Sequence, residues 1–448
     1  MTSFAPGLDG LIAELRWRGM FHAASDGLEA RLASGRPISG YNGFDPSGPW
    51  LHIGHLVPIF GLLHLQRHGG RPIVVMGGGT GMVGDPSGRS TERNLLDRPT
   101  IEANVESQRG QFERLLDFSG PEGAVLVDNF DWLEPIHLLE WLRDVGKHFT
   151  VPYMLAKDSV QVRLDRGLSF TEFSYMLIQA TDFAHLHRSL GVELQMGGAD
   201  QWGNITAGLE LIRREGAVGE AGASAELELS GRAVETGTGR LEAYALAYPL
   251  LLSPSGAKFG KTEGGESIWL HPDGTTPYAF YQHWLNTDDR DVPVYLRWFT
   301  TLEPDEIEAL EAQLAAHPEE RAAQRALAFD VTSRVHGTQP AAGVVRASEL
   351  LFEPAPIRDP ATLEHIHAVV GGFTVDATLV AAGAVAVLAE EGLAPSRSEA
   401  RRLIRGGAVT INGEAIREPG APMPPPIDGR WWEVRIGKRR REVGRLEG

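Results

Sequence analysis

The stretch FDPSGPWLHIGHL, Phe44 to Leu56, joins two kinds of sequence pattern and carries two histidines three residues apart. GRPISGYNGF before it is typical of a strand, and LVPIFGLLHLQRHG after it has the apolar spacing of a helix. RPIVVMGGGTG, Arg71 to Gly81, is then a buried strand that ends in a glycine turn. Such a strand–helix–strand unit predicts a parallel sheet with a right-handed crossover, and ligands of these sheets bind beyond the C-terminal strand ends. FDPSGPWLHIGHL and GGGTGMVGDPSG both fall at that edge.

His52 and His55 suit three kinds of site: a metal site, an acid–base pair, or a pair of hydrogen-bond donors to an anion. Near a helix N-terminus, residues three apart face the same side, and the unpaired backbone N–H groups favour an anion. Gly54 between them lets a ligand approach the backbone closely. A metal site normally has further ligands at a recognisable spacing, and no such set is evident. The pattern therefore favours an anion site, with two ordinary histidines as the alternative.

A second stretch, SPSGAKFGKTEGGES (Ser253 to Ser267), combines four glycines with Lys258 and Lys261. Lysine is rare in this chain: of the 42 basic residues five are lysines, at positions 147, 157, 258, 261 and 438. Two of them within four residues indicate a site that requires a compact, flexible positive charge, as a transferring phosphate does. The spacing differs from that of a P-loop. The alternative is a solvated glycine loop.

Composition and charge indicate a globular protein with a basic tail. A chain of 448 residues is too long to fold around one compact core, so two or three domains are expected. The chain has no cysteine, which excludes disulfides and thiolate chemistry. The net charge is −17, yet Gly392 to Gly448 holds 12 Lys and Arg against 7 Asp and Glu, which predicts a polyanion-binding module there. No signal peptide and no membrane span is evident, so we expect a cytoplasmic protein without membrane association.

Four regions that differ in sequence pattern and composition predict the domain organisation. Residues 1–245 alternate strand and helix patterns, which predicts an α/β domain, and the Gly-, Ala- and Glu-rich segment 215–241 within it predicts a mobile surface insertion. Residues 246–350 contain the two lysines and then helical stripes such as EIEALEAQLAA. Residues 351–375 have the composition of a linker, and residues 376–448 predict a compact α+β module.

Five stretches together resemble a known family. They are, in chain order, YNGFDPSGPWLHIGHL, GGGTGMVGDPSGR, SYMLIQATDF, QMGGADQWGNI and KFGKTEGGESIWL. The HIGH tetrapeptide at 52–55 and KFGKT at 258–262 resemble the two signatures of class I aminoacyl-tRNA synthetases. Over nearly its whole length the chain is similar to the bacterial-type tyrosyl-tRNA synthetases. The resemblance implies a Rossmann-like parallel-sheet catalytic domain, an α-helical anticodon-side domain and an S4-like RNA-binding domain.

The resemblance also implies an activity. A tyrosine–tRNA ligase activates L-tyrosine with ATP to tyrosyl-adenylate and pyrophosphate, and then transfers tyrosine to the 3′ end of tRNA(Tyr). Mg²⁺ would arrive with ATP, and neither a bound prosthetic group nor a metal site of the protein's own is expected. A homodimer with tRNA bound across both subunits is implied as well.

Catalytic and nucleotide-binding roles follow from the same resemblance. Catalysis here needs positioned charge that stabilises the departing pyrophosphate rather than covalent participation. The residues expected to supply it are His52, His55, Lys258, Lys261 and Thr262. Those expected on the ATP side are Gly43, Asp45, Ser47, His52, Gly54, His55, Asp200, Gln201, Lys258 and Lys261. Arg89 and Arg93 either reach the pyrophosphate or are ordinary surface arginines.

A tyrosine pocket must satisfy a phenolic hydroxyl, bury a ring and pair an ammonium group, because an unpaired buried polar group is costly. The resemblance implies that Tyr41 and Asp182 meet the hydroxyl. It places Asp85, Tyr175, Gln179 and Gln201 around the ammonium group. In SYMLIQATDF, Tyr175, Gln179 and Asp182 fall at i, i+4 and i+7, which puts them on one helix face. A buried structural network is the alternative for this polar face.

The C-terminal segment APSRSEARRLIRGGAVTINGEAI predicts a helix capped by Ser396 or Ser398, followed by a strand and a turn. The segment resembles the S4 RNA-binding domain. Arginines on such a helix suit a phosphate backbone without reading its sequence. The arginines expected to bind RNA are Arg397, Arg401, Arg402 and Arg405. The later KRRR, residues 438–441, is expected to extend the basic surface, with a solvated tail as the alternative.

Some features depart from the family pattern, and two other functions remain open. Gly48-Pro49-Trp50 replaces the small polar residues usual before LHIGHL and is not explained by the resemblance; Asn42 stands near the expected ribose. One alternative is a synthetase for tryptophan, against which Asp182 and the S4-like tail argue, because an indole offers only a donor. The other is an RNA-binding or regulatory protein without catalysis, against which the intact histidines and lysines argue.

Overall fold

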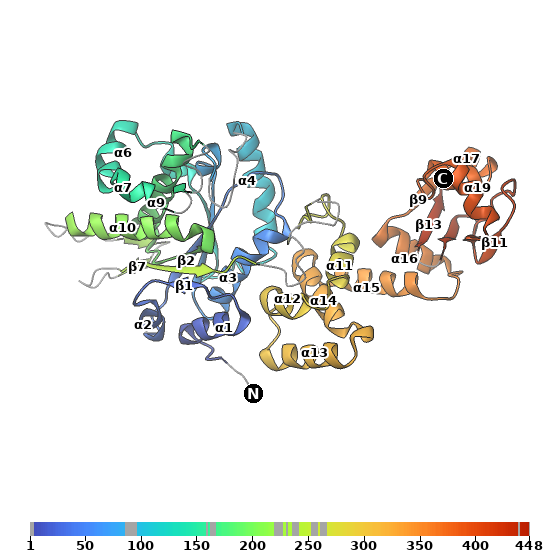
Figure 1. Ribbon diagram of the computed structural model, residues 1–448, viewed down its shortest axis with the longest axis horizontal. Coiled ribbons are helices and arrows are strands. Elements are labelled where there is room, and N and C mark those ends of the chain that lie inside the picture. The colour runs from blue at the N-terminus through green and yellow to red at the C-terminus, as the bar shows by residue number, and fades with distance from the viewer. Residues whose placement is uncertain are drawn as a thin grey trace. The chain divides into compact units, whose positions relative to one another are not determined.

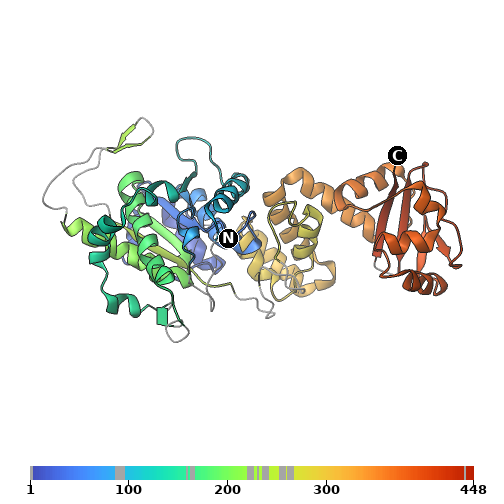
Figure 2. The ribbon, with the colours of Figure 1, turned by 90° about the horizontal axis from the view of Figure 1, so that it is seen from above.

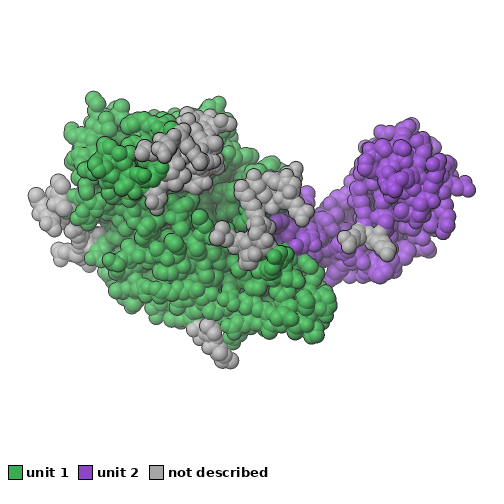
Figure 3. Space-filling view, in the orientation of Figure 1, with its two compact units in different colours: residues 1–274, 287–327 green, residues 275–286, 328–448 purple. Residues whose placement is uncertain are grey.

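The computed structural model describes residues 4–85, 96–157, 160–161, 167–218, 227–229, 232–234, 242–251, 259, 267–437 and 440–447. The chain divides into two compact units, coloured green and purple in Figure 3. Unit 1 comprises residues 1–274 and 287–327, and unit 2 comprises residues 275–286 and 328–448. Within the described residues, none of the helices is both long and apolar enough to cross a membrane.

Unit 1 is built around a six-stranded sheet (Figure 1). Its strands, in spatial order, are β1 (Ala23–Ala24), β8 (Tyr244–Tyr248), β5 (Leu194–Gly198), β2 (Ser39–Phe44), β3 (Arg71–Met76) and β4 (Val125–Asp128). All neighbours are parallel except β1, which runs antiparallel to β8. The predicted strand–helix–strand unit is confirmed, since α3 (Leu56–Arg67) connects β2 and β3. The α/β class is therefore correct.

Helices lie on both faces of the sheet (Figure 2), and the alternation along β2 shows which residues face which layer. The ring of Tyr41 lies 5.4 Å from that of Phe183 on α9 (Phe170–Leu190), which packs with α10 (Trp202–Val218). The next residue, Asn42, points to α3 instead and donates to the carbonyl of Pro58 at 3.0 Å. Gly61 lets α3 lie close to the sheet, because a Cβ there would be 1.8 Å from the Tyr248 hydroxyl.

The remaining helices of unit 1 surround this core. They are α1 (Leu11–Arg18), α2 (Leu28–Ala33), α4 (Arg98–Phe112), α5 (Phe130–Leu133), α6 (Leu138–Asp144), α7 (Val151–Leu155), α12 (Val292–Phe299) and α13 (Pro304–Ala316). Helix α14 (Ala322–His336) runs from unit 1 into unit 2. Most of the expected insertion 215–241 lies outside the described residues. Within it, α10 continues to Val218, and β6 (Leu227–Leu229) pairs with β7 (Arg232–Val234).

A buried charged cluster connects α1, α3 and the end of α12. Arg18 Nε donates to Glu14 Oε1 at 2.6 Å, and His68 Nε2 lies 2.6 Å from Glu14 Oε2. Arg18 also donates to the carbonyls of Arg297 and Thr300. Burial alone would raise the pKa of Glu14, but the interactions with His64 of α3, with His68 just after that helix and with the Arg18 charge bring it far below its ordinary value. The cluster therefore holds the helix that begins at the HIGH tetrapeptide.

Unit 2 contains helices and a five-stranded sheet. The spatial order of the strands is β11 (Glu414–Ile416), β10 (Val409–Ile411), β12 (Trp431–Ile436), β13 (Arg440–Leu446) and β9 (Phe373–Val375). The helices are α11 (Pro277–Leu285), α15 (Thr338–Phe352), α16 (Pro360–Val370), α17 (Ala377–Ala381), α18 (Ala384–Glu390) and α19 (Arg397–Arg405). Residues 351–375, where a linker is expected, thus contain α16 and β9. The predicted strand and turn are present: Asn412 and Gly413 both have positive φ between β10 and β11.

Candidate active site

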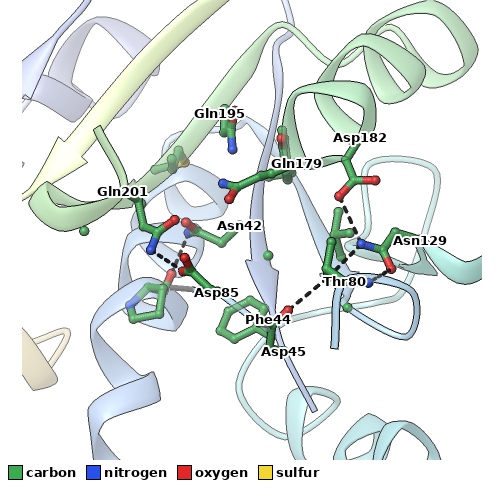
Figure 4. Close-up of a pocket in the computed structure, with 18 of the residues that line it drawn as sticks. Asn42, Phe44, Asp45, Thr80, Asp85, Asn129, Gln179, Asp182, Gln195 and Gln201 are labelled. Carbon is green, nitrogen blue, oxygen red and sulfur yellow. Dashed lines mark hydrogen bonds between the residues drawn. The ribbon is translucent and has the colours of Figure 1, made fainter. Parts of the chain in front are cut away.

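A cavity of about 310 Å³ lies where β2, β3 and β5 end (Figure 4). Chain segments on both sides of β2 contribute to it, which is the usual ligand position in open parallel sheets. The cavity brings together these predicted residues: Tyr41, Gly43, Asp45, Ser47, His52, His55, Asp85, Tyr175, Gln179, Asp182 and Gln201. Gly54 and Asp200 are sequence neighbours of lining residues but do not line the cavity themselves. Lys258, Lys261 and Thr262, with Arg89 and Arg93, lie outside the described residues.

One end of the cavity is shaped for a group that both donates and accepts a hydrogen bond. The Tyr41 hydroxyl is buried and has no hydrogen-bond partner among the described residues. The Asp182 carboxylate, also buried, accepts from Asn129 Nδ2 at 3.0 Å and from Trp132 Nε1 at 2.8 Å. Burial raises the pKa of Asp182 to about 7, although these two hydrogen bonds oppose the shift. Burial likewise raises the pKa of Tyr41, so its hydroxyl keeps its proton.

Helix α9 places three polar residues on the cavity wall. Tyr175, Gln179 and Asp182 all line the cavity, so the predicted helix face is confirmed. The Ser169 side chain caps the helix by accepting from the backbone N–H of Glu172. The polar face of α9 therefore faces the cavity rather than the core.

The opposite side of the cavity is acidic and rich in amides (Figure 4). Gln201 Nε2 donates to Asp85 Oδ2 at 2.7 Å. Asn204 Nδ2 donates to Gln179 Oε1 at 3.0 Å and to Gln201 Oε1 at 3.1 Å. The surrounding protein and the nearby Asp85 carboxylate raise the pKa of Asp200. This concentration of carboxylate and amide oxygens suits a cationic group such as an ammonium.

Asp45 lies between the residues predicted to bind tyrosine and those predicted to bind the nucleotide. Its carboxylate accepts from Thr80 Oγ1 at 2.9 Å and from the Tyr175 hydroxyl at 3.3 Å. Asn129 Nδ2 in turn donates to Thr80 Oγ1 at 3.0 Å. This chain of hydrogen bonds connects the Asp182 end of the cavity to the loop that leads to the histidines.

The two histidines are oriented by their own backbone. His52 Nδ1 accepts from the N–H of Gly54, and His55 Nδ1 accepts from the N–H of His52, both at 3.0 Å. A neutral imidazole whose Nδ1 accepts must carry its proton on Nε2. The two ring centroids are 4.0 Å apart, at the start of α3. The pair thus has the geometry of two Nε2–H donors beside a positive helix end, which suits an anion.

The segment that follows the two lysines pairs with the histidine segment. Ile53 N donates to the carbonyl of Ile268 at 3.0 Å, and Leu270 N donates to that of Leu51 at 2.8 Å. His52 is thereby directly opposite Trp269. Phe259, which follows Lys258 in the sequence, stacks on Phe299 of α12 with a centroid distance of 5.1 Å.

Several lining residues were not expected from the sequence. Besides Asn42, which was noted only as a departure, the main ones are Thr80, Asn129 and Gln195. Asn129 follows β4, so the end of the apolar run AVLVDN would have been the signal for it. The Gln195 side chain lies on β5 within an apolar strand, and its Oε1 has no partner among the described residues.

The predicted basic helix is present in unit 2. The Ser396 side chain caps α19 by accepting from the N–H of Glu399. All four candidate arginines are exposed; Arg397 pairs with Glu390 and Arg402 with Glu399. Of the KRRR stretch, Lys438 and Arg439 lie outside the described residues and Arg440 is exposed, but the expectation that the stretch extends the basic surface is wrong for Arg441. That side chain is buried against Glu433 at 2.7 Å, and it donates to the carbonyl of Leu350 because the C-terminal end of α15 offers unpaired acceptors.

Comparisons with known proteins find matching family models, similar sequences and a similar solved structure. Residues 33–353 match the family described as tRNA synthetases class I (W and Y), and residues 385–423 match the S4 domain. The tyrosine–tRNA ligase of Anaeromyxobacter dehalogenans is 50% identical over 416 residues, 92% of this chain and 93% of that protein. That of Geobacillus stearothermophilus is 44% identical over 439 residues, 96% of this chain and 98% of that protein. The structure of a C-terminally truncated Aspergillus nidulans mitochondrial tyrosyl-tRNA synthetase aligns with TM-score 0.64 and 28% identity, covering 76% of this chain and 94% of that one.

Proposed function

This chain belongs to the class I tRNA synthetases of the tryptophan and tyrosine group, and from that premise we propose that it is a tyrosine–tRNA ligase. The observation that carries the choice of tyrosine is the Tyr41 hydroxyl, which is buried near the Asp182 carboxylate and has no partner in the part of the chain that the structure describes. A phenol satisfies both groups, since it donates to the carboxylate and accepts from the hydroxyl. An indole would donate to Asp182 and leave the Tyr41 hydroxyl unpaired.

The first half-reaction forms a mixed anhydride. A tyrosine carboxylate oxygen attacks the α-phosphorus of ATP, the bond from that phosphorus to the bridging oxygen breaks, and pyrophosphate leaves with the electron pair. Asp85, Gln179 and Gln201 hold the ammonium group, so the carboxylate points toward the histidine side. The Nε2–H groups of His52 and His55 stabilise charge that develops on the phosphates, together with Lys258, Lys261 and Thr262.

The remaining nucleotide contacts belong to residues on the same side of the cavity. Gly43, Asp45, Ser47 and Gly54 lie along the path from β2 to the histidines, and the carboxylate of Asp200 follows β5. Mg²⁺ accompanies ATP as part of the substrate complex and reduces the repulsion between its phosphates and these carboxylates. No prosthetic group takes part in this chemistry.

The second half-reaction transfers tyrosine to the terminal ribose of tRNA(Tyr). The S4 domain supports an RNA partner, and Arg397, Arg401, Arg402 and Arg405 on α19 contact the phosphate backbone. Such contacts give affinity, whereas the choice of tRNA depends on base contacts. The reaction takes place in the cytoplasm, where tRNA and ATP are available.

An apolar patch on the surface of unit 1 supports a homodimer, in which the patch contacts a second copy of the chain. The patch consists of Met82, Ile136, Leu138, Leu139, Leu142 and Phe170, with exposed fractions between 37% and 80%. Four of these residues line an apolar hollow of about 560 Å³. Large exposed apolar side chains gathered in this way mark an interface. A homodimer that buries this patch is therefore part of the proposal.

ATP–pyrophosphate exchange with each of the twenty amino acids tests the assignment. We expect exchange with tyrosine and charging of tRNA(Tyr). Exchange with tryptophan in place of tyrosine would select the other member of the family group. Exchange with no amino acid would indicate a protein that keeps the fold without the catalysis.

A further inference from the structure

The Gly48-Pro49-Trp50 lip is held on one side by three amide side chains of α4. Asn104 Nδ2 donates to the Pro46 carbonyl at 2.9 Å, and Gln108 Nε2 donates to the Gly48 carbonyl at 2.7 Å. Gln111 Oε1 accepts from the N–H of Leu51 at 3.0 Å. All three amides are buried and lie at i, i+4 and i+7, on one helix face. Helix α4 therefore holds the backbone that leads directly into His52.

On its other side, the lip packs against the segment that follows the lysines. The Trp50 ring is parallel to that of His271, with an interplanar angle of 2° and centroids 5.5 Å apart. It meets Trp269 edge-on at 6.0 Å and 73°. Gly274 closes this packing, because a Cβ there would lie 2.7 Å from atoms of both tryptophans. We call Trp50, Trp269 and His271 the ring cluster.

The ring cluster lies immediately beside the backbone pairing that orients the first histidine. The bonds from Ile53 to Ile268 and from Leu270 to Leu51 enclose the pair His52 and Trp269. Two hydrogen bonds form a very short ladder, and an isolated ladder of this length is marginal in water. Cross-strand aromatic contacts are the usual means of stabilising one.

We propose that Trp50 is a positioning residue for the ATP side of the reaction. It stabilises the pairing between residues 51–53 and 268–270 and so holds His52 at the angle from which its Nε2–H meets a phosphate. Trp50 does not line the cavity, so it acts through His52 rather than by touching substrate. Tyr41 lies on β2 and Asp182 on α9, and neither belongs to the ring cluster, so we expect a change at Trp50 to affect the ATP side more than the tyrosine end. The proposal rests on the function given above.

The test compares Trp50→Ala and Trp50→Phe in the full chain. We expect Trp50→Ala to lower kcat/KM for ATP in tyrosine-dependent exchange on the order of tenfold, the equivalent of one aromatic contact. The KM for tyrosine should stay within about twofold of the wild-type value. A general loss of structure would instead change the parameters of both substrates. Trp50→Phe should restore most of the loss. Trp17→Ala, a half-buried tryptophan of α1, is the matched control and should leave the ATP parameters unchanged.

A double-mutant cycle assigns the effect to the stack. If Trp50 acts through His271, Trp50→Ala with His271→Ala should lose little more than Trp50→Ala alone. Isothermal titration of ATP without amino acid measures the same effect independently of tyrosine activation, and the Kd should rise in Trp50→Ala. An unchanged Kd and kcat/KM for ATP, an equal loss for both substrates, or no restoration by phenylalanine would each overturn the role of Trp50. Wild-type chain that binds ATP but exchanges with no amino acid would instead overturn the proposed function.

Discussion

In the proposed function, discrimination between tyrosine and phenylalanine depends on the Asp182 carboxylate. Its two oxygens already accept from Asn129 and Trp132, so the carboxylate is fixed in place before a ligand arrives. The neighbouring Tyr41 hydroxyl makes no other bond among the described residues. Both groups are dehydrated when a phenylalanine ring enters, and neither obtains a new partner. Rejection of phenylalanine therefore comes from the unpaired polar groups rather than from lack of space.

Replacing Asp182 should reduce this discrimination. We expect Asp182→Ala to lower kcat/KM for tyrosine by roughly 10- to 100-fold, the cost of one hydrogen bond to a charged group, with little change for phenylalanine. Exchange kinetics with both amino acids measure the ratio. Asp182→Asn keeps the size of the side chain and serves as the control for packing. If the preference for tyrosine persisted in both variants, Asp182 would not be the acceptor for the hydroxyl.

Elements whose apolar residues repeat at a regular spacing were predictable from the sequence, whereas contacts between distant elements were not. The apolar runs around 56–69 and 71–76 specify α3 and β3 because burial repeats along them. Helix α4 was not predicted to hold the lip, since its amides on one face resemble a solvated surface until their partners are known. The contact of Trp50 with His271 joins segments far apart in the chain, and no local pattern reports it. Asn129 was missed for the same reason, because its role depends on β4 lying beside β3.

The attachment of α3 to α1 should make the stability of unit 1 depend on pH. Burial lowers the pKa of His64 from 6.5 to about 4, so the folded chain keeps this ring neutral while the unfolded chain takes up a proton. Stability from His64 is present above pH 6.5 and is lost as the pH falls toward 4, by about 3 kcal/mol. His68 acts in the opposite sense: burial lowers its pKa, but the bonds to Glu14 and Gly7 outweigh this and raise it.

Urea unfolding of wild type and His64→Leu at pH 7, 6 and 5 measures this term. The variant should be less sensitive to acid than the wild type between pH 6.5 and 4, because only the wild type carries the buried neutral imidazole. Because Glu14 also interacts with His64, the pKa of Glu14 is measured in both proteins to separate the two contributions. Equal pH slopes would show that His64 does not contribute to acid sensitivity.

At the scale of the whole molecule, chemistry and RNA binding are divided between the two units. Unit 1 contains the cavity, and unit 2 contains the S4 module. Arg441 of that module donates to the Leu350 carbonyl at the end of α15, and Arg435 donates to the Glu353 carbonyl at the C-cap, so part of the basic composition of the tail serves packing within unit 2. Composition predicted the location of this module correctly, but it could not separate arginines that face solvent from those that cap a helix.

The apolar patch gives a prediction about assembly. Leu139 is 80% exposed, and Leu139→Asp should convert a dimer to a monomer, because a buried unpaired carboxylate at the interface is costly. Light scattering coupled to size-exclusion chromatography measures the mass. Phe352→Asp changes an exposed apolar residue of α15, outside the patch, and should leave the mass unchanged. A wild-type monomer, or a dimer that persists in Leu139→Asp, would exclude this patch as the interface.

The pairing of residues 51–53 with 268–270 also forms late in synthesis, because its second segment lies after β8 in the chain. A nascent chain that has emerged as far as β8 contains the sequence of all six strands of the sheet, both histidines, and the residues proposed to meet the tyrosine hydroxyl. It lacks Ile268 and Leu270, the partners of the histidine segment, and it lacks both lysines. A chain that ends at β8 therefore contains residues proposed to bind tyrosine but lacks several of those proposed to stabilise the phosphates of ATP.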